Sequence, residues 1–260
     1  MANGTALVTG ASGGIGMEIA RVLSREGYRV VLVARRREEL ERLAAELGNA
    51  LVCTADLTKR EAADDVLAWC AKEKLEIDVL VNNAGFGSAG FFADLDTQRE
   101  LDMVQVNCGA LVHFTRLFLT PMLARKRGRI LNVGSTAGFQ PGPFMAVYYA
   151  TKAFVNSFSE ALSVELQGTG VSCTVLCPGP TETGFVAAAK MEGSALFKML
   201  AVSNAKSVAE DGVRGMLRGK AIVVSGLSNK LAIQANRVSP RALVRAMTGR
   251  MNRVKKHSAG

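Results

Sequence analysis

Histidine and cysteine are both scarce in this chain of 260 residues, which contains two histidines and five cysteines. The cysteines are scattered without metal-ligand spacing, so we expect free, buried thiols in a reducing cytoplasm and no metal site. The chain also lacks a secretory signal pattern, and no apolar run approaches the roughly 20 residues of a membrane-spanning helix. These absences exclude a secreted disulfide scaffold, a histidine-based metal centre and an integral membrane protein. They favour a soluble, cytoplasmic protein.

Acidic residues are missing from the last part of the chain. None follows Asp211, whereas eleven of the 32 basic residues lie between Arg214 and Lys256. This leaves 21 basic residues against all 23 acidic ones in the remainder, so the net charge of +9 belongs to the C-terminal region alone. A nucleic-acid-binding fold would carry basic residues over one face of its body, so we expect no nucleic-acid partner.

The basic C-terminal segment, residues 227–260, contains a helical apolar pattern. Leu243, Met247, Met251 and Val254 follow one another at spacings of four and three, with arginines elsewhere around the helix. Such a basic amphipathic helix can lie on an anionic membrane, bind an acidic protein or pack into a subunit interface. The sequence leaves these three roles open.

A regular alternation of short β-branched runs and longer amphipathic segments fills the rest of the chain. Strand-like runs lie at Thr5–Thr9, Arg29–Ala34, Ala50–Thr54, Val79–Asn82, Arg129–Val133, Val171–Leu176 and Ala221–Val224. Helical patterns lie at Ile15–Arg25, Arg37–Leu47, Lys59–Lys74, Gln98–Arg125, Ala150–Gln167 and Val208–Leu217. Most strand-like runs are apolar on both faces, as in a sheet covered by helices on both sides. The pattern predicts a single α/β domain over residues 1–260, a Rossmann-type doubly wound parallel sheet of about seven strands with helices on both faces.

Two local patterns refine this prediction near the last helix. The segment 183–204 follows Pro178-Gly179-Pro180 and interrupts the strand–helix alternation, so we expect a substrate lid there. Ser207 and Glu210 have the spacing of a capping box, which predicts that the last helix of the alternation begins after Ser207.

The first predicted turn, Thr9–Gly16, is rich in glycine and opens the first helix. Glycines let phosphate oxygens approach the backbone N–H groups, and the helix N-terminus favours their negative charge. The turn therefore predicts a dinucleotide site, although glycine can also serve only the torsion angles of a strand–helix turn. Residues 10–14 match the nucleophile elbow of serine hydrolases as well, with Ser12 as nucleophile. Neither His113 nor His257 is well placed to act as its base.

The end of the second predicted strand distinguishes the two nicotinamide cofactors. An acidic residue there would bind the ribose hydroxyls of NAD(H), but the strand ends at Ala34 and continues into Arg35, Arg36 and Arg37. A guanidinium group can bind the 2′-phosphate of NADP(H) in a bidentate manner. The run favours NADP(H), with Arg35 as the contact, over the alternative of a solvated basic start to the next helix.

Tyr148 and Lys152 lie four residues apart in a predicted helix and so share one face. A nearby ammonium group lowers the pKa of a phenol. Tyr148 could then donate a proton to a carbonyl oxygen, or accept one from an alcohol. Tyr149, three residues before Lys152, could take the same place on a helix. In isolation, a packed ring beside a lysine is the simpler interpretation of such a pair.

The pair does not stand in isolation, because further motifs occur in order on the expected elements. They are Thr9–Gly16, Asn82-Asn83-Ala84-Gly85, Asn107, Ser135, Tyr148 with Lys152, and Pro178-Gly179. With these residues, the chain from about Thr5 to Val224 resembles the short-chain dehydrogenase/reductase family, most of all its bacterial, NADP-preferring, broad-specificity members. The spacing of that family selects Tyr148 rather than Tyr149.

The resemblance implies roles for individual residues. Tyr148 would be the general acid/base, Lys152 would lower its pKa and hold the nicotinamide ribose, Ser135 would bind the substrate oxygen and Asn107 would anchor a water molecule. The cofactor contacts implied are Gly10, Ser12, Gly14, Ile15, Gly16, Arg35, Asp56, Asn83, Ala84, Gly85, Tyr148, Lys152, Pro178, Gly179 and Thr183. Asp56 would bind adenine, and it is also placed to cap the next helix. The resemblance further implies a homodimer or homotetramer.

We therefore expect an NADP(H)-dependent oxidoreductase that interconverts a carbonyl and an alcohol on a medium-sized, apolar small molecule. Phe139, Phe144, Met145 and other apolar residues near the predicted site could line its pocket. Two alternatives from other classes remain. One is a dinucleotide-binding redox sensor without catalysis, and the other is a serine hydrolase that uses Ser12.

Overall fold

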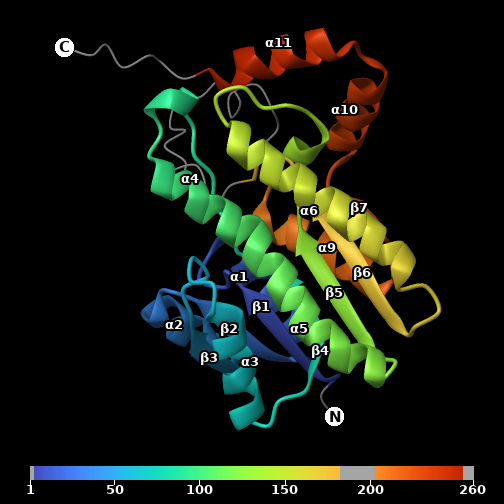
Figure 1. Ribbon diagram of the computed structural model, residues 1–260. Helices are drawn as coiled ribbons and strands as arrows, with labels where there is room; N and C mark the ends of the chain where they lie inside the picture. The colour runs from blue at the N-terminus through green and yellow to red at the C-terminus, as the bar shows by residue number, and fades with distance from the viewer. Residues whose placement is uncertain (1–2, 182–202, 254–260) are drawn as a thin grey trace.

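Seven parallel strands form the centre of the molecule in the computed structural model, which describes residues 3–181 and 203–253 (Figure 1). The strands are β1 (Thr5–Thr9), β2 (Arg29–Ala34), β3 (Ala50–Thr54), β4 (Ile77–Asn82), β5 (Gly128–Val133), β6 (Val171–Cys177) and β7 (Ile222–Val224). Their order across the sheet is β3-β2-β1-β4-β5-β6-β7. The predicted doubly wound parallel sheet is confirmed, and the strand order reverses between β1 and β4.

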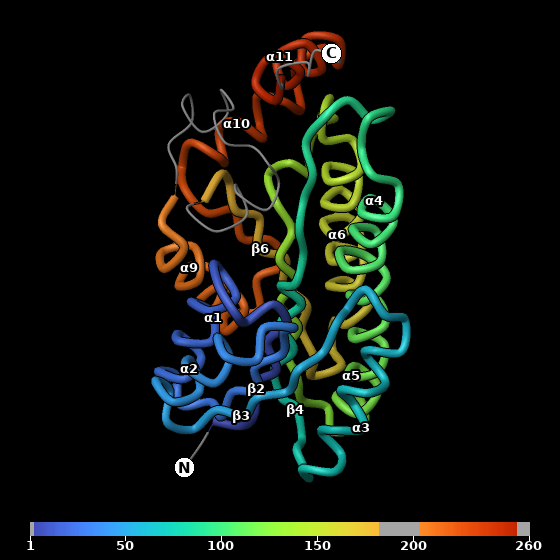
Figure 2. Tube along the Cα trace, turned by 90° about the vertical axis from the view of Figure 1, so that its left-hand side faces the viewer, coloured from blue at the N-terminus to red at the C-terminus, as the bar shows by residue number. Residues whose placement is uncertain are grey.

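Helices cover both faces of the sheet, as Figure 2 shows with the sheet seen from its side. One face carries α1 (Gly14–Arg25), α2 (Arg37–Leu47) and α9 (Ala205–Leu217), and the other carries α3 (Ala62–Lys72), α4 (Thr97–Val104), α5 (Leu111–Ala124) and α6 (Ala146–Glu165). A hydrophobic core lies on each face of the sheet, and successive residues of a strand point into these two cores alternately. On β2, Val30 and Leu32 pack in one core, and Val31 and Val33 pack in the other.

The bounds of α2 agree with the sequence prediction because both of its ends carry clear signals. Glu38 and Glu39 lie in its first turn, where the helix dipole favours acidic residues. Gly48 follows its last residue with φ of 70°, a left-handed conformation that glycine adopts without steric cost.

Three predicted helix starts are wrong: α6 begins at Ala146, four residues before the predicted Ala150, and the starts of α9 and α3 involve local turns. α9 begins at Ala205, where the Asn204 side chain accepts a hydrogen bond from the N–H of Lys206, so Ser207 lies inside the first turn and is not a cap. α3 begins only at Ala62. Asp56 therefore does not cap it, and its carboxylate instead accepts a hydrogen bond from the N–H of Thr58. At α9 and α3, a side chain bonds backbone in a local turn, which the spacing alone does not distinguish from a cap.

The predicted helix at Gln98–Arg125 is interrupted in its middle. A π-helical segment, η2 (Gln105–Ala110), joins α4 to α5 and contains Asn107. Such segments are rare and frequently lie at functional sites. Apolar periodicity continues through the segment, which is why the sequence predicts one unbroken helix.

Two helices follow the last strand and lie at one end of the molecule, at the top of Figures 1 and 2: α10 (Leu227–Val238) and α11 (Arg241–Asn252). We call residues 227–252 the C-terminal arm. α11 matches the predicted amphipathic helix, whereas α10 was not predicted. Residues 182–202, which hold most of the predicted lid, lie outside the described part of the chain. No helix in the described part is both long and apolar enough to cross a membrane.

Candidate active site

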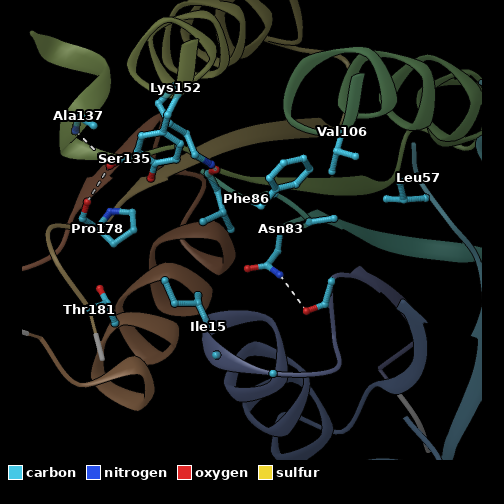
Figure 3. Close-up of a pocket in the computed structure, with 18 of the residues that line it drawn as sticks. Ile15, Leu57, Asn83, Phe86, Val106, Ser135, Ala137, Lys152, Pro178 and Thr181 are labelled. Atoms are coloured by element: carbon cyan, nitrogen blue, oxygen red, sulfur yellow. Dashed lines mark hydrogen bonds between the residues drawn. The ribbon is translucent and has the colours of Figure 1, made fainter. Parts of the chain in front are cut away.

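A cavity of about 550 Å³ opens at the carboxyl ends of the central strands (Figure 3). Its walls come from the turns after β1, β2, β3, β4, β5 and β6, from α6 and from α11. The point where the strand order of an open α/β sheet reverses is the place where such folds bind ligands. The cavity lies at this point, between β1 and β4.

The glycine turn after β1 forms one wall of the cavity through Gly10, Ser12, Gly13, Gly14 and Ile15. Gly10 has φ of 68°, and a Cβ atom there would lie 2.8 Å from the Cα of Ala84. Gly16, behind the wall, has no room for a side chain because Asn83 occupies that space. Both positions therefore require glycine, which keeps the backbone of the turn exposed to the cavity.

Asn83 connects this turn to the end of β4. Its side-chain amide donates hydrogen bonds to the carbonyl oxygens of Thr9, at 2.9 Å, and Gly10, at 3.2 Å (Figure 3). Asn83, Ala84 and Gly85 all line the cavity. The side chain of Asn83 thus fixes the geometry of the turn.

Arg35, the predicted phosphate contact, and Arg36 both follow β2 and line the cavity. The guanidinium group of Arg36 also donates hydrogen bonds to Ser12, to its carbonyl oxygen at 2.9 Å and its hydroxyl at 3.2 Å. Arg37 pairs with Glu41 on α2 and does not line the cavity. The guanidinium group of Arg36 therefore lies against the glycine turn, and Arg35 lies in the same cavity wall.

The predicted residues Ser135, Tyr148 and Lys152 line the same cavity, together with Pro178 and Gly179. Figure 3 shows Ser135, Lys152 and Pro178 in one part of it. The hydroxyl of Ser135 accepts a hydrogen bond from the N–H of Ala137, at 3.0 Å. It also lies 3.5 Å from the carbonyl oxygen of Pro178 and hydrogen-bonds the Tyr148 phenol. A substrate oxygen placed here would therefore have two hydroxyl groups within reach.

The pKa of Tyr148 moves in the direction opposite to the prediction. Burial raises it, and the hydrogen bond with Ser135 offsets this only in part. The ammonium group of Lys152 is the expected opposing influence, but it lies 6.0 Å from the centre of the Tyr148 ring and donates a hydrogen bond of 2.7 Å to the carbonyl oxygen of Val133. Desolvation therefore dominates the phenol, which stays protonated at neutral pH.

Lys152 is itself buried, with 7% of its surface exposed. Burial lowers the pKa of its ammonium group from 10.5 to about 8. The group therefore loses its proton far more easily than a surface lysine, which suits a residue beside a proton-transfer site.

Asn107 lies behind the cavity wall rather than in it. Its side chain accepts a hydrogen bond from the N–H of Phe86, at 3.1 Å, and donates to the carbonyl oxygen of Phe86 and to the hydroxyl of Thr151, each at 3.0 Å. Gly85 lies against the same side chain. Asn107 thus connects η2, the loop after β4 and α6 directly behind Lys152.

The remaining predicted residues divide into three groups. Asp56 lines the cavity, and so does Met145. Phe139 and Phe144 do not line it. Thr183 lies outside the described residues.

Sequence reasoning missed several residues that line the cavity. They are Leu57, Phe86, Val106, Thr136, Gln140, Thr181 and Met251. Most of them lie within two residues of a predicted site residue, so their places follow once those residues are known, whereas Gln140 lies further away. Met251 comes from α11, about a hundred residues beyond Tyr148, and the apolar pattern that includes it does not indicate that it reaches the cavity.

Neither histidine supplies a base for Ser12 within the described part of the chain. The imidazole of His113 lies 3.4 Å from the Asp64 carboxylate, and His113 does not line the cavity. His257 lies outside the described residues. The cavity therefore has no nucleophile–base pair of the hydrolase kind among the residues described. Those residues also contain no group of three or more histidine, cysteine or carboxylate side chains that could hold a metal ion.

Comparison with known proteins gives one consistent group. A family model described as short chain dehydrogenase matches residues 4–193. An uncharacterized oxidoreductase of Staphylococcus epidermidis is 37% identical over 179 residues, which cover 68% of this chain and 78% of that protein. The NADP-dependent 3-hydroxy acid dehydrogenase YdfG of Escherichia coli is 41% identical over 175 residues, or 66% of this chain and 71% of that protein.

Among solved structures, a short-chain dehydrogenase from Sphingobium yanoikuyae in complex with NADPH has a TM-score of 0.79 at 28% identity. The superposition covers 99% of this chain and 98% of that one. The likeness in fold therefore extends beyond the residues matched by the family model.

Proposed function

The chain belongs to the short-chain dehydrogenase family and is an NADP(H)-dependent oxidoreductase, and from this premise we propose that it interconverts a carbonyl and an alcohol on a medium-sized apolar substrate, with Tyr148 as the general acid/base. The observation that carries the proposal is the meeting of Tyr148, Ser135 and Lys152 in one cavity with the glycine turn. A redox sensor without catalysis would have no use for these three groups at the far end of a dinucleotide site.

The residues of the cavity fit NADP(H). Gly10, Gly13 and Gly14 line the cavity and place no side chain between the turn and a pyrophosphate, and the N-terminus of α1 favours its charge. Arg35 and Arg36 would bind the 2′-phosphate, Asp56 the adenine and Asn83 to Gly85 the adenosine ribose. Lys152 would hold the nicotinamide ribose, bordered by Pro178 and Gly179. When bound, the cofactor supplies or accepts the hydride.

The chain's own groups manage the proton. In the direction of reduction, Ser135 would orient the carbonyl oxygen by a hydrogen bond, and Tyr148 would donate its proton to that oxygen as the hydride reaches the carbon. The raised pKa of Tyr148 keeps the phenol protonated and ready for this step. Lys152 would then return a proton toward the phenolate, which its lowered pKa makes easier.

The lining of the cavity supports an uncharged, apolar substrate. Phe86, Val106, Met145 and Met251 contribute apolar side chains. The only cationic side chains in the described lining are Arg35, Arg36 and Lys152, and all three have roles toward the cofactor. A substrate carboxylate would therefore find no dedicated partner in this part of the wall, which separates the proposal from a 3-hydroxy acid substrate.

Oxidation of NADPH and of NADH in the presence of small carbonyl compounds tests the proposal. We expect turnover with NADPH on apolar ketones and aldehydes, and weak turnover with NADH or with 3-oxo acids. Preference for a 3-oxo acid would overturn the substrate assignment but not the Tyr148 mechanism. Turnover that persists after Tyr148→Phe would overturn the mechanism.

A further inference from the structure

The outer face of the C-terminal arm exposes a series of large apolar side chains. The exposed fractions are 72% for Leu227, 62% for Leu231, 85% for Val238, 51% for Leu243 and 55% for Met247. The first three lie four and seven residues apart and so share one face of α10, and the last two share one face of α11. Each helix therefore presents an apolar stripe to the outside.

The inner face of the arm carries both apolar and polar side chains, with Ile233 buried on α10 and Met251 of α11 lining the cavity. On α11, the buried residues are Val244, Thr248 and Asn252. The side chain of Asn252 accepts a hydrogen bond of 3.3 Å from the Tyr149 hydroxyl and donates one of 3.2 Å to the carbonyl oxygen of Pro143. The arm is thus held to the body by a few buried apolar side chains and by hydrogen bonds, while five large apolar side chains remain exposed on its outer face.

Basic residues surround these stripes, and the arm has no acidic residue. Its basic residues, all of them exposed, are Lys230, Arg237, Arg241, Arg245 and Arg250, and the exposed Arg253 follows directly after the arm. None of them forms a salt bridge within the described part of the chain. The surface therefore combines uncompensated positive charge with exposed apolar side chains.

We propose that the C-terminal arm docks the protein on an anionic lipid surface. The apolar stripes would enter the boundary between headgroups and acyl chains, and the long basic side chains would extend to the anionic headgroups. A second copy of the chain is a poorer occupant, because it would bring the same positive charge against this one. A fluid lipid boundary also accepts stripes on two separate helices without a matching rigid shape.

Co-sedimentation of the full-length protein with vesicles tests the docking surface directly. Vesicles of phosphatidylcholine alone are compared with vesicles that also contain phosphatidylglycerol, each at low and high salt. We expect binding only to the anionic vesicles, and weaker binding as salt rises. Equal binding to neutral vesicles, or none to anionic ones, would overturn the proposal. The measurement needs no turnover, so its outcome is independent of the proposed function.

Variants separate the charge of the arm from the charge of the whole protein. Arg241→Gln/Arg245→Gln/Arg250→Gln should weaken binding to anionic vesicles by about tenfold or more, since each basic residue near such a surface contributes strongly. The control Arg42→Gln/Lys72→Gln/Lys126→Gln removes three exposed charges from the body and should bind as the wild type does. Equal loss in both variants would contradict a role for the arm.

A second variant tests the apolar stripe and the rival occupants. Leu243→Ser/Met247→Ser alters exposed side chains, so its melting temperature and NADPH affinity should be unchanged while vesicle binding falls. Binding to polyglutamate is measured for comparison. If the wild type binds polyglutamate as tightly as anionic vesicles, and the variant binds both as the wild type does, the partner is an acidic polymer and the proposal is wrong. It is equally wrong if the variant changes the oligomeric mass in light scattering and leaves vesicle binding intact.

Discussion

Tyr148 and Tyr149 are adjacent on α6 and both line the cavity, yet their hydroxyl groups have different partners. The phenol of Tyr148 hydrogen-bonds Ser135, whereas that of Tyr149 donates to Asn252 on the C-terminal arm. Burial raises the pKa of both phenols. At the scale of single residues, the partner of each hydroxyl group therefore distinguishes the two roles: Tyr148 is placed to donate a proton, and Tyr149 attaches the C-terminal arm.

Removal of the Tyr148 hydroxyl should stop catalysis without loss of the cofactor site. We expect Tyr148→Phe to lower kcat by about 10²-fold or more, because a positioned general acid contributes about that factor. NADPH affinity, measured by fluorescence titration, should change little. Tyr149→Phe serves as the matched control and should retain most of the turnover. The opposite ranking of the two variants would refute the assignment.

Lys152 predicts a particular dependence of stability on pH. Its pKa is lowered from 10.5 to about 8 by burial, so between these values the unfolded chain binds a proton that the folded protein does not. The free energy of unfolding should therefore rise with pH through this window, and the cost of the buried charge is fully present below it. The effect is at most about 3 kcal/mol.

Denaturant unfolding of wild type and Lys152→Met at neutral pH and near pH 10 measures this dependence. The difference between the two free energies of unfolding should move in favour of the wild type as pH rises. Lys72→Met, at an exposed position on α3, should show no such change in the difference. A difference that is constant over the window would show that Lys152 is not desolvated in the folded protein.

Arg36 and Arg35 predict the preference for NADPH. Arg36→Gln should raise the Kd for NADPH by about tenfold or more, since a hydrogen bond between charged groups contributes about 1.5–3 kcal/mol. The Kd for NADH should hardly change. Arg35→Gln should act in the same direction, and Arg37→Gln, which alters a residue outside the cavity, should not. Loss of NADH and NADPH binding together would indicate damage to the glycine turn instead.

The catalytic trio was predicted through the resemblance of the ordered motifs to a known family, since the spacing of Tyr148 and Lys152 alone fits a packed ring beside a lysine equally well. The arginine run after β2 was also predicted, but the hydrogen bonds from Arg36 to Ser12 could not be, because only the folded chain shows which guanidinium group reaches the glycine turn. The direction of the Tyr148 pKa was not predicted either. The four-residue spacing indicates that Lys152 lies near Tyr148. It does not indicate that the ammonium group of Lys152 donates its hydrogen bond to the carbonyl oxygen of Val133 rather than approaching the phenol.

At the scale of elements, the π-helical segment η2 and the helix α11 position the site without belonging to its motifs. η2 turns the side chain of Asn107 toward the Phe86 backbone, which stabilises the loop after β4. Helical periodicity does not reveal this segment, since the apolar pattern continues across it. α10 was not predicted either; Ile233 is its only buried residue, and its other large apolar side chains, Leu227, Leu231 and Val238, are exposed.

Asn252 is the residue by which α11 is attached near the site, and its side chain is fully buried. Asn252→Ala should remove one of the two hydrogen-bond partners of the Tyr149 hydroxyl, which keeps Gln140, and the side-chain donor to the Pro143 carbonyl, at a cost of about 1–3 kcal/mol in stability. Because Met251 precedes Asn252 and lines the cavity, the same variant should displace the Met251 side chain. This displacement should raise KM for an apolar substrate more than it lowers kcat. Calorimetry and steady-state kinetics measure the two effects. Leu243→Ala, on the outer face of α11, is the control, and an equal effect of both variants would contradict the attachment.

At the scale of the whole molecule, the site is a product of the strand order. β1 lies at the centre and pairs with both β2 and β4, so the turns after β1 and β4 are neighbours although about 75 residues separate Thr9 from Ala84. The sequence predicted this architecture correctly because strands that are apolar on both faces leave few other arrangements. It gave no account of how the C-terminal arm reaches the cavity, because only tertiary contacts determine that.

The cavity wall runs from Gly10 in the first turn to Met251 in the last helix, and this span has a kinetic consequence. A refolding chain can complete its helices and much of its sheet while α11 is still undocked, because contacts between distant parts of a chain form late. During dilution from denaturant, far-ultraviolet circular dichroism should therefore recover before enzymatic activity does. Asn252→Ala should lengthen the delay, because it weakens the attachment of α11. The recovery of turnover would then measure the docking of α11, which completes the cavity wall.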